Sequence, residues 1–373
     1  MLSLVQIREL HIELTERCNA ECPMCGRRDR GGKLNPNLEN REIRLKEFRK
    51  FFPLSFLRQL SSMRLCGNFG DPAAARDTIA ICEHARAANP RLALRMNSNG
   101  GIRSKDWWFQ LARLYRGKND SVQFGIDGLE DTHSLYRRGT NFKTVLRNAE
   151  AFIRGGGNAH WVFLVFEHNE HQVFDAECLA NELGFSQFTV KATKRFLGAQ
   201  RLSVSETAPV CDNDGDELYQ LRLPKDRRMW NETLLNVQRG GGTIDSALDT
   251  TPVRCKALDR RGLFVSAEGL VFPCCWLGAA RFPNERGTQT AQLDHLVHAA
   301  GGCDRLSLHA RNLEDVFESQ FFDLVEASWG RPSVAEGRLQ VCARVCGEKI
   351  EAFEKQFVRD TALVFREKQV EFC

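Results

Sequence analysis

Six short runs of apolar residues, several of them alternating with polar residues, occur in the first two hundred positions of the chain. Such runs are typical of buried or half-buried strands. The predicted strands are Leu10–Leu14, Met63–Cys66, Leu92–Met96, Val122–Ile126, Trp161–Phe166 and Phe188–Ala192. Between them, apolar residues recur at helical spacing over about 75–88, 105–115, 142–154 and 170–183. Strands that alternate with helices predict an α/β fold, in which helices cover a parallel sheet.

The polar residues of these strands are expected on one face of the sheet. Successive side chains of a strand point to opposite faces, so Arg95 faces away from Leu94, and Glu167 faces away from Leu164 and Phe166. If helices cover the apolar face and the six strands curl into a partial barrel, the polar face surrounds a cavity. The residues expected there are Glu13, Arg95, Asn97, Gln123, Asp127, Glu167 and Lys191. Alternatively, several of them end a strand and meet water.

The second half of the chain has a different pattern. From about 195 to 251 it is polar, and its acidic cluster Asp212–Asp216 lacks the ligand spacing of an EF-hand, so this part is expected to be a solvated linker. The run Leu263–Phe272 then predicts a hairpin that turns at 267–269, and a helical stretch follows near Leu313–Ala327. The predicted organisation is a barrel domain over 1–200, a linker over 201–254 and a smaller domain over 255–373.

Composition and charge exclude several classes of protein. The 373 residues are 42% hydrophobic, enough for a full core, but no apolar run reaches the length of about 18 residues that a membrane span needs. The first residues do not combine a basic start with an apolar core, so no secretory signal is expected and the predicted location is the cytoplasm. The net charge of +4 is small, and the interspersed Lys and Arg residues do not indicate a nucleic-acid partner.

Fourteen cysteines is a high number for a chain without an export signal, and metal binding explains them better than disulfides in a reducing compartment. Cys18, Cys22 and Cys25 follow the first strand, where a loop can turn three thiolates toward one point. Three thiolates leave an iron–sulfur cluster one ligand short, so one iron is open to a small molecule. The alternatives are a zinc knuckle, which needs a fourth nearby Cys or His, or unrelated core cysteines. The nearest histidine, His11, lies on the strand.

A second group of cysteines lies in the smaller domain. The predicted hairpin folds the chain back, which brings Cys255 close to Cys274. Cys342 and Cys346 are four residues apart and can share one helical face or a tight loop. Two pairs of thiolates make a site with four ligands. Such a site suits a 4Fe–4S cluster, and a structural zinc ion is the alternative.

Turn residues follow several of the predicted strands. Gly70 and Asp71 lie in a glycine-containing loop after the second strand, where a backbone can approach a ligand and a carboxylate can accept a hydrogen bond from an ammonium group. The third strand ends in Asn97, Ser98 and Asn99, and the fourth ends in Asp127. Arg137 follows the fourth strand, and its guanidinium matches the geometry of a carboxylate. A surface ion pair is the alternative role for Arg137.

The cysteine spacing C-x3-C-x2-C, together with these strand-end turns, resembles the radical SAM family. Met24 stands where the family usually has an aromatic residue, Asp71 replaces the Glu of a Gly-Gly-Glu-Pro motif, and Gly125 replaces a serine. The resemblance implies that Cys18, Cys22 and Cys25 hold a 4Fe–4S cluster and that S-adenosylmethionine (SAM) chelates its fourth iron. It also implies a cofactor-binding set consisting of Gly70, Asp71, Asn97, Ser98, Asn99, Asp127, Arg137 and Lys191. Within this set, Asp71 and Arg137 would hold the amino and carboxylate ends of the methionyl group.

The cysteines of the smaller domain are similar to those of the SPASM and Twitch auxiliary-cluster domains of this family. Cys255, Cys274, Cys342 and Cys346 fit the shorter Twitch form with one auxiliary 4Fe–4S cluster. The spare cysteines Cys275, Cys303 and Cys373 can each replace one of these ligands. The resemblance therefore implies a partial, TIM-like (β/α)6 barrel followed by a Twitch domain made of a β-hairpin and helices.

The activity implied by the resemblance is reductive cleavage of SAM to a 5′-deoxyadenosyl radical, which takes a hydrogen atom from a substrate C–H bond. Substrates of similar enzymes are peptides or small sugar-like metabolites, and the electron donor is a flavodoxin or a ferredoxin. The polar inner face favours a substrate rich in hydroxyl or amine groups. The alternative function is that of a protein without catalytic activity that transfers electrons through iron–sulfur clusters or binds zinc.

Overall fold

The computed structural model describes residues 2–197, 204–240, 245–282 and 287–348, and of residues 237–240, 245–247, 287 and 288 it describes only the backbone. Within these ranges an eight-stranded sheet has the order β10-β9-β1-β2-β3-β4-β5-β6, and β7 and β8 form a separate antiparallel ribbon. The strands are β1 (Glu9–Ile12), β2 (Ser62–Leu65), β3 (Ala93–Ser98), β4 (Ser121–Gly125), β5 (Ala159–Val165), β6 (Gln187–Ala192), β7 (Thr207–Cys211), β8 (Glu217–Arg222), β9 (Gly262–Val265) and β10 (Val271–Phe272).

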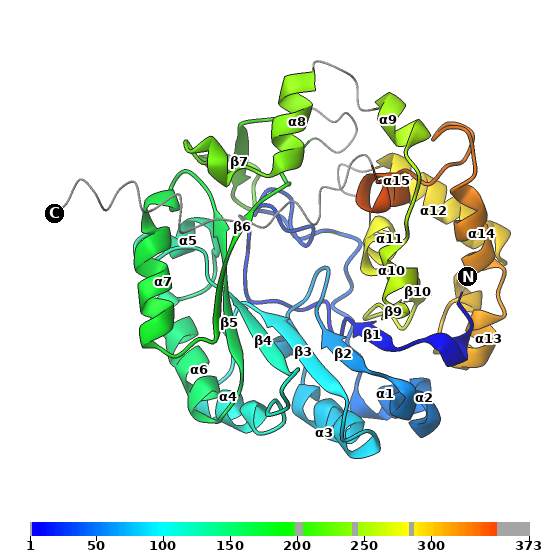
Figure 1. Ribbon diagram of the computed structural model, residues 1–373, viewed down its shortest axis with the longest axis horizontal. Helices are drawn as coiled ribbons and strands as arrows, with labels where there is room; N and C mark the ends of the chain where they lie inside the picture. Colours follow the sequence, from blue (N-terminus) through cyan, green and yellow to red (C-terminus); the bar gives the residue numbers. More distant parts are fainter. Residues whose placement is uncertain (1, 198–203, 241–244, 283–286, 349–373) are drawn as a thin grey trace.

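Helices connect the parallel strands and lie along the outside of the curved sheet (Figure 1). The α-helices of the barrel half are α1 (Leu45–Phe51), α2 (Leu54–Gln59), α3 (Thr78–Ala88), α4 (Lys105–Ala112), α5 (His133–Tyr136), α6 (Phe142–Arg154) and α7 (Val173–Glu182). Further along lie α8 (Glu232–Gly240), α9 (Asp245–Thr250), α10 (Lys256–Asp259), α11 (Cys275–Ala280), α12 (Gly287–Ala299), α13 (Leu313–Phe317), α14 (Phe321–Ser328) and α15 (Gln340–Cys346). The 3-10 helices are η1 (Leu4–Gln6), η2 (Pro72–Ala74), η3 (Glu170–Gln172), η4 (Arg227–Met229) and η5 (Cys303–Arg305).

Strands β1 to β6 run parallel in sequence order, which confirms the predicted α/β fold with six parallel strands. The hydrophobic pattern explains the layers, because the side chains of Leu94, Met96 and Phe124 point toward the helices and are fully buried. Most of the stability of the surrounding helices comes from their packing against this apolar face and not from the helix propensity of their residues. The carboxyl ends of the six strands therefore meet at one edge, where ligand sites of such folds lie.

The predicted hairpin is present as β9 and β10, but it does not stand apart from the barrel. Strand β9 pairs in parallel with β1, and Glu9 lies opposite Gly262 in the register. The hairpin thus extends the main sheet beyond its first strand and carries α11 and the following helices with it. The apolar run Leu263–Phe272 predicted a hairpin but contained no signal for its partner strand.

Residues 201–254 contain regular structure in the part that is described, contrary to the expected solvated linker. Strands β7 and β8 pair with one another, and α8 follows. Leu221 and Leu234 are buried in an apolar cluster that also contains Cys22. The ribbon therefore covers the cysteine loop, and the polar character of the stretch reflects its exposed outer side. The domain boundaries themselves stay a prediction.

Within the described residues, no helix combines the length and apolar character required to cross a bilayer.

Candidate functional site

The loop after β1 brings the thiols of Cys18, Cys22 and Cys25 together. Cys18 interacts electrostatically with both of the other thiols, and the backbone N–H of Cys25 donates to the carbonyl of Cys22 over 3.0 Å in a tight turn. Cys22 is buried, and Cys18 and Cys25 are partly buried. The sequence predicted three cysteines at one point on this loop, and the structure places them there.

Several donors point at the sulfur atoms of this loop. The backbone N–H of Ala20 lies 3.3 Å from Cys18 Sγ, Asn99 Nδ2 lies 3.5 Å from the same atom, and Arg137 Nη1 lies 3.7 Å from Cys22 Sγ. Burial raises the pKa of the Cys22 thiol, while the charges of Arg137 and Arg195 lower it. N–H groups and guanidinium ions stabilise anionic sulfur, so these surroundings fit thiolate ligands of an iron–sulfur cluster.

Two arginines near the cysteine loop were missed by sequence reasoning. The guanidinium of Arg195 interacts electrostatically with Cys22 and Cys25, and that of Arg27 interacts with Cys18 and Cys25. Arg195 also donates to the hydroxyl of Tyr136 over 2.5 Å. Arg27 lies just after the last cysteine of the loop, so the sequence alone could have indicated its place. Arg195 follows β6, and only the folded chain brings it to the loop.

An apolar cluster packs against the same loop. It contains Tyr136 and Phe166, whose ring centroids lie 4.7 Å apart, together with Cys22 and the partly buried Leu164. The predicted parity of β5 was wrong at this point, because Trp161, Phe163 and Val165 are the fully buried residues of the strand. Leu164 therefore points into the barrel rather than toward the helices. The run is apolar on both faces, and a pattern without alternation does not specify a face.

Asp71 is fully engaged in holding neighbouring loops. Its Oδ1 accepts from the backbone N–H of Ala73 over 2.9 Å, its Oδ2 accepts from the N–H of Asn99 over 2.7 Å, and the Ser98 hydroxyl donates to both oxygens. Three donors thus fill most of the roughly four acceptor positions of a carboxylate. Asn99 in turn donates to Cys18 Sγ. The predicted residues Asp71, Ser98 and Asn99 therefore form one network that positions the cysteine loop.

Gly70 allows two loops to approach closely. A Cβ atom at this position would overlap with the carbonyl group of Thr15, so only glycine fits against the loop that leads to the cysteines. Glu13 stabilises the same turn through two hydrogen bonds. Its Oε1 accepts from the backbone N–H groups of Phe69 and Gly70 over 2.8 and 3.0 Å. Burial raises the pKa of Glu13 to about 8, although these two N–H groups lower it.

Arg137 lies inside the molecule rather than in a surface ion pair. Its Nε lies 2.5 Å from Oδ2 of Asp127, which is fully buried, and Asp127 Oδ1 accepts from the N–H of Leu164 over 2.6 Å. A Cβ atom at Gly125 would overlap with Arg137 Nη2. Gly125, which stands where relatives have a serine, thus provides the space that the guanidinium occupies.

The remaining predicted residues separate into two groups. Asn97 is partly buried, and its Oδ1 has no hydrogen-bond partner among the described residues; Lys191 interacts with Asp127 and Cys66 inside the barrel. The register places Arg95, Asn97 and Gln123 on the same inner face.

Glu167 differs, since it lies past the end of β5 and pairs with Lys225 at 3.1 Å. The prediction that Glu167 lies in the central cavity was therefore wrong. Cations in the region of β7 and β8 attract its carboxylate to the side away from that cavity.

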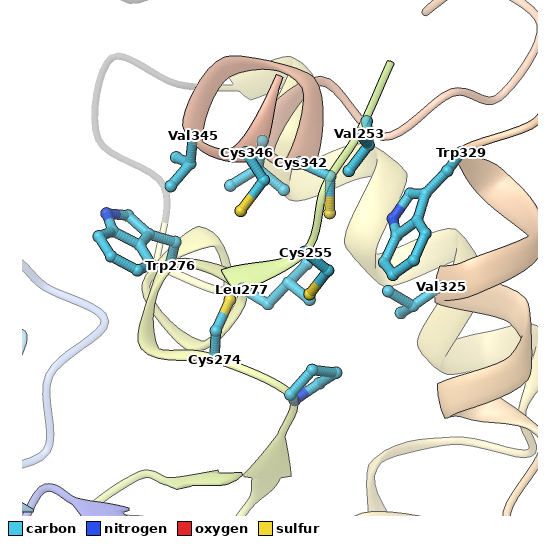
Figure 2. Close-up of a pocket in the computed structure, with 12 residues that line it drawn as sticks. Val253, Cys255, Cys274, Trp276, Leu277, Val325, Trp329, Cys342, Val345 and Cys346 are labelled. Atoms are coloured by element: carbon cyan, nitrogen blue, oxygen red, sulfur yellow. The ribbon is translucent and has the colours of Figure 1, made fainter. Parts of the chain in front are cut away.

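A second cavity lies between α10, α11, α14 and α15 and is surrounded by cysteines. The thiols of Cys255, Cys274, Cys342 and Cys346 all line it, and Figure 2 shows their sulfur atoms turned toward a common space. Cys255 and Cys346 are close enough to share a hydrogen bond, and the N–H of Arg254 donates to the carbonyl of Cys346 over 3.0 Å. The four cysteines that the sequence grouped are thus brought together from three segments of the chain.

The walls of this cavity are apolar. Trp276, Leu277, Val325 and Trp329 surround the sulfur atoms, and the empty space is about 340 Å³ (Figure 2). Burial raises the pKa of Cys274 to about 11 and also raises the pKa of Cys342. Metal binding would displace protons from these thiols, and thiolates in a dry pocket suit an iron–sulfur cluster or zinc.

The spare cysteines do not line this cavity. The thiol of Cys275 interacts with Cys66 and Glu13 of the barrel, and Cys303 is exposed, 2.9 Å from Arg281 Nη1. Cys373 lies outside the described residues. Throughout the described part of the chain, no three His, Cys, Asp or Glu side chains are placed as ligands of a single metal ion.

Comparison with known proteins agrees with this architecture. Residues 12–173, which include the cysteine loop after β1, match the family model of the Radical SAM superfamily. The match spans the strands β2 to β5 and all three cysteines of the loop after β1. No curated protein matches the sequence.

Several solved structures are similar to the chain. Streptococcus suis SuiB bound to S-adenosylmethionine is 13% identical with a TM-score of 0.45, and the match covers 72% of this chain and only 60% of SuiB. The structure of anSMEcpe with bound AdoMet is 17% identical with a TM-score of 0.48, covering 94% of this chain and 98% of that one. BtrN in complex with AdoMet and 2-DOIA is 11% identical with a TM-score of 0.44, covering 90% and 92%.

Proposed function

We propose that the chain binds a 4Fe–4S cluster through Cys18, Cys22 and Cys25 and uses SAM to remove a hydrogen atom from a substrate C–H bond. When bound, the cluster supplies the electron that cleaves SAM to methionine and a 5′-deoxyadenosyl radical. The protein positions SAM and the substrate and excludes water from them. The product class is a peptide or a small polar metabolite that has been oxidised or otherwise modified.

The observation that carries this proposal is the composition of the cysteine loop. After burial, the side chains that most affect the pKa of Cys18 are Asp71, Cys22 and Cys25, and those that most affect the pKa of Cys22 are Arg137, Cys25, Asp127 and Arg195, with neither a histidine nor a fourth cysteine among them. Of these aspartates, Asp71 is held by three donors through four hydrogen bonds, and Asp127 is held by Arg137. Three available thiolates favour an iron that is open to a small molecule.

Arg137 is the proposed partner of the SAM carboxylate. Its Nε is engaged with Asp127, and the guanidinium carries further N–H donors that can reach a ligand. Asp71 is proposed to act mainly by shaping the loop Gly67–Asp71 and by adding negative charge near the methionyl amino group, since little acceptor capacity is left on its oxygens. Gly70, Asn97, Ser98, Asn99, Asp127 and Lys191 complete the proposed cofactor-binding set.

The four-cysteine cavity is the proposed site of an auxiliary 4Fe–4S cluster, with Cys255, Cys274, Cys342 and Cys346 as ligands. The four thiols that line the cavity fit such a cluster, and a structural zinc ion is the alternative. When bound there, such a cluster would supply a one-electron acceptor for the substrate; a mainly structural role and a role in binding the substrate are the alternatives. A flavodoxin or a ferredoxin is the proposed electron donor.

Anaerobic reconstitution tests the proposal. Protein loaded with iron and sulfide, reduced with dithionite and incubated with SAM should release 5′-deoxyadenosine and methionine in equal amounts. A Cys25→Ala variant should release neither, because the loop then holds too few ligands. Cys178→Ala is the matched control, since Cys178 lies on α7 away from the loop. Absence of 5′-deoxyadenosine from fully loaded protein would refute the proposed function.

A further inference from the structure

Another cavity, next to the four-cysteine cavity, opens on the inner face of the barrel between β1, β2, β9, α10 and the start of α11. It contains about 520 Å³ of empty space, part of it at the open mouth. Pro273, Cys274 and Trp276 line both this cavity and the four-cysteine cavity, so the two are neighbours. Strand β2 carries Arg64 into it and continues toward Cys66 and the loop Gly67–Asp71. A ligand in this cavity therefore lies next to the four-cysteine cavity.

The charge of the lining is strongly unbalanced. Arg64, Lys256 and Arg260 line the cavity, whereas Glu9 is the one carboxylate among its lining residues. His11 also lines it, but burial lowers the pKa of this imidazole to about 4, so it is neutral at pH 7. The lining thus carries a net charge of +2, in a recess that is partly open to solvent.

Arg64 is the most unusual of these cations. The register of β2 and β3 places it directly beside Arg95 on the same inner face, and like charges at such positions destabilise a sheet. Burial lowers the pKa of Arg64, the neighbouring Arg95 and Arg260 lower it further, and Cys66 and Glu9 act in the opposite direction. Within the described part of the chain, the Arg64 side chain has no ion pair and no hydrogen bond. Its N–H donors are therefore available to an incoming anion.

We propose that this cavity binds an anionic group of the substrate, a carboxylate or a phosphate, through the Arg64 guanidinium. The inference rests on the proposed function and narrows its substrate class to molecules that carry such a group. Arg64 offers a planar fork of N–H donors that matches both oxyanions, and Arg260 and Lys256 add positive charge from α10. Substrates whose corresponding end is cationic are disfavoured by the same charges.

The first measurement is the thermal stability of the full-length protein at matched ionic strength, in millimolar inorganic phosphate, in succinate or in chloride. A ligand that binds only the folded protein raises its Tm, and a shift of about 2 °C is readily resolved. The expected result is a higher Tm in phosphate or in succinate than in chloride. The anion that raises the Tm identifies the kind of anionic group that the cavity binds. Equal Tm values in phosphate, succinate and chloride would overturn the proposal.

Variants locate the effect. Arg64→Gln is expected to lose more than half of the anion-dependent shift, and Arg64→Lys is expected to retain part of it. Phosphate stabilises many proteins non-specifically, so Arg58→Gln, which removes an exposed arginine from α2, serves as the control that should keep the full shift. An undiminished shift in Arg64→Gln would overturn the assignment.

The Tm of the Arg64→Gln variant in chloride distinguishes anion binding from a structural role for Arg64, because the two roles predict opposite changes. If Arg64 is held for an absent anion, Arg64→Gln relieves its repulsion with Arg95 and raises the Tm in chloride. A lower Tm, or a variant that fails to fold, would show a structural role and overturn the proposal for Arg64, and Arg260→Gln would then test whether the cavity binds anions at all. None of these measurements requires SAM or reductant, so their failure is distinct from a failure to form 5′-deoxyadenosine.

Discussion

The two cysteine sites of the molecule are built in different ways. The three thiols of the first site come from one loop, and polar donors such as Asn99 and Arg137 point at their sulfur atoms. The four thiols of the second site come from three segments and face apolar walls that include Trp276 and Trp329 (Figure 2). The first site thus combines three thiols with many hydrogen-bond donors, and the second combines four thiols with apolar walls.

This difference indicates different tasks. Donors and guanidinium groups around sulfur support a site at which charge changes and a polar molecule binds. A closed ligand set in an apolar pocket fixes the chain segments that supply it, and the backbone contact between Arg254 and Cys346 shows how closely these segments approach. We therefore expect the first site to control activity and the second to contribute more to stability.

The largest effect is expected from replacing all three cysteines of the loop after β1. Protein with two 4Fe–4S clusters contains about eight iron atoms per chain, and the Cys18→Ala/Cys22→Ala/Cys25→Ala variant should retain about half of them. It should form no 5′-deoxyadenosine. Iron and sulfide analysis together with product assays check both numbers. Retention of all the iron would show that these cysteines are not ligands.

The Cys342→Ala/Cys346→Ala variant should also lose about half of the iron, but its Tm should fall further than that of the triple variant. The second site closes long loops between Cys255, Cys274 and α15, and closure of long loops contributes most to stability. Thermal unfolding of both variants under anaerobic conditions compares them. Equal Tm values would remove the proposed distinction between the two sites.

A Gly125→Ala variant should affect only the first site. The added methyl group displaces the Arg137 guanidinium, so we expect the KM for SAM to rise about tenfold or more while the iron content stays unchanged. Gly330→Ala is the control, because a Cβ atom at this position meets no atom closer than 3.8 Å. An unchanged KM for SAM in Gly125→Ala would exclude Arg137 as the partner of the SAM carboxylate.

The smallest effect concerns Glu13, which supports the loop next to the first site. Its pKa rises from 4.5 to about 8 on folding, so the protonated form is favoured and the folded protein loses stability as the pH rises between these values. Glu13→Gln cannot ionise, and its Tm should exceed that of the unmodified protein by an amount that grows from pH 5 to pH 8. Thermal unfolding across this range measures the difference. A difference independent of pH would show that Glu13 is ionised throughout.

The sequence predicted those parts of the molecule that depend on local pattern. Alternation along Leu94–Asn97 assigned the faces of β3, and the spacing of Cys18, Cys22 and Cys25 placed three thiols on one loop. It also grouped Cys255 with Cys274 through the hairpin, and Cys342 with Cys346 through their spacing on α15. Short-range geometry constrains side chains in these cases, because strands have a period of two residues and helices bring residues four apart onto one face.

Other features depend on tertiary contacts that no local pattern encodes. The apolar run of β5 did not reveal that Leu164 faces the cysteine loop, and Arg195 reaches that loop only because β6 ends beside it. The engagement of Asp71 by Ser98 and Asn99 follows from the spacing of neighbouring strand ends. The pairing of β9 with β1 likewise needed the folded structure, since a strand sequence does not specify its neighbour.

Electron paramagnetic resonance tests the central claim, an iron in the first site that is open to SAM. The Cys342→Ala/Cys346→Ala variant leaves only the cluster of the first site, so the spectrum of the reduced protein reports that site alone. We predict that addition of SAM changes this spectrum, because SAM enters the coordination of one iron. An identical spectrum with and without SAM, in protein that contains its full four-iron cluster, would contradict the account.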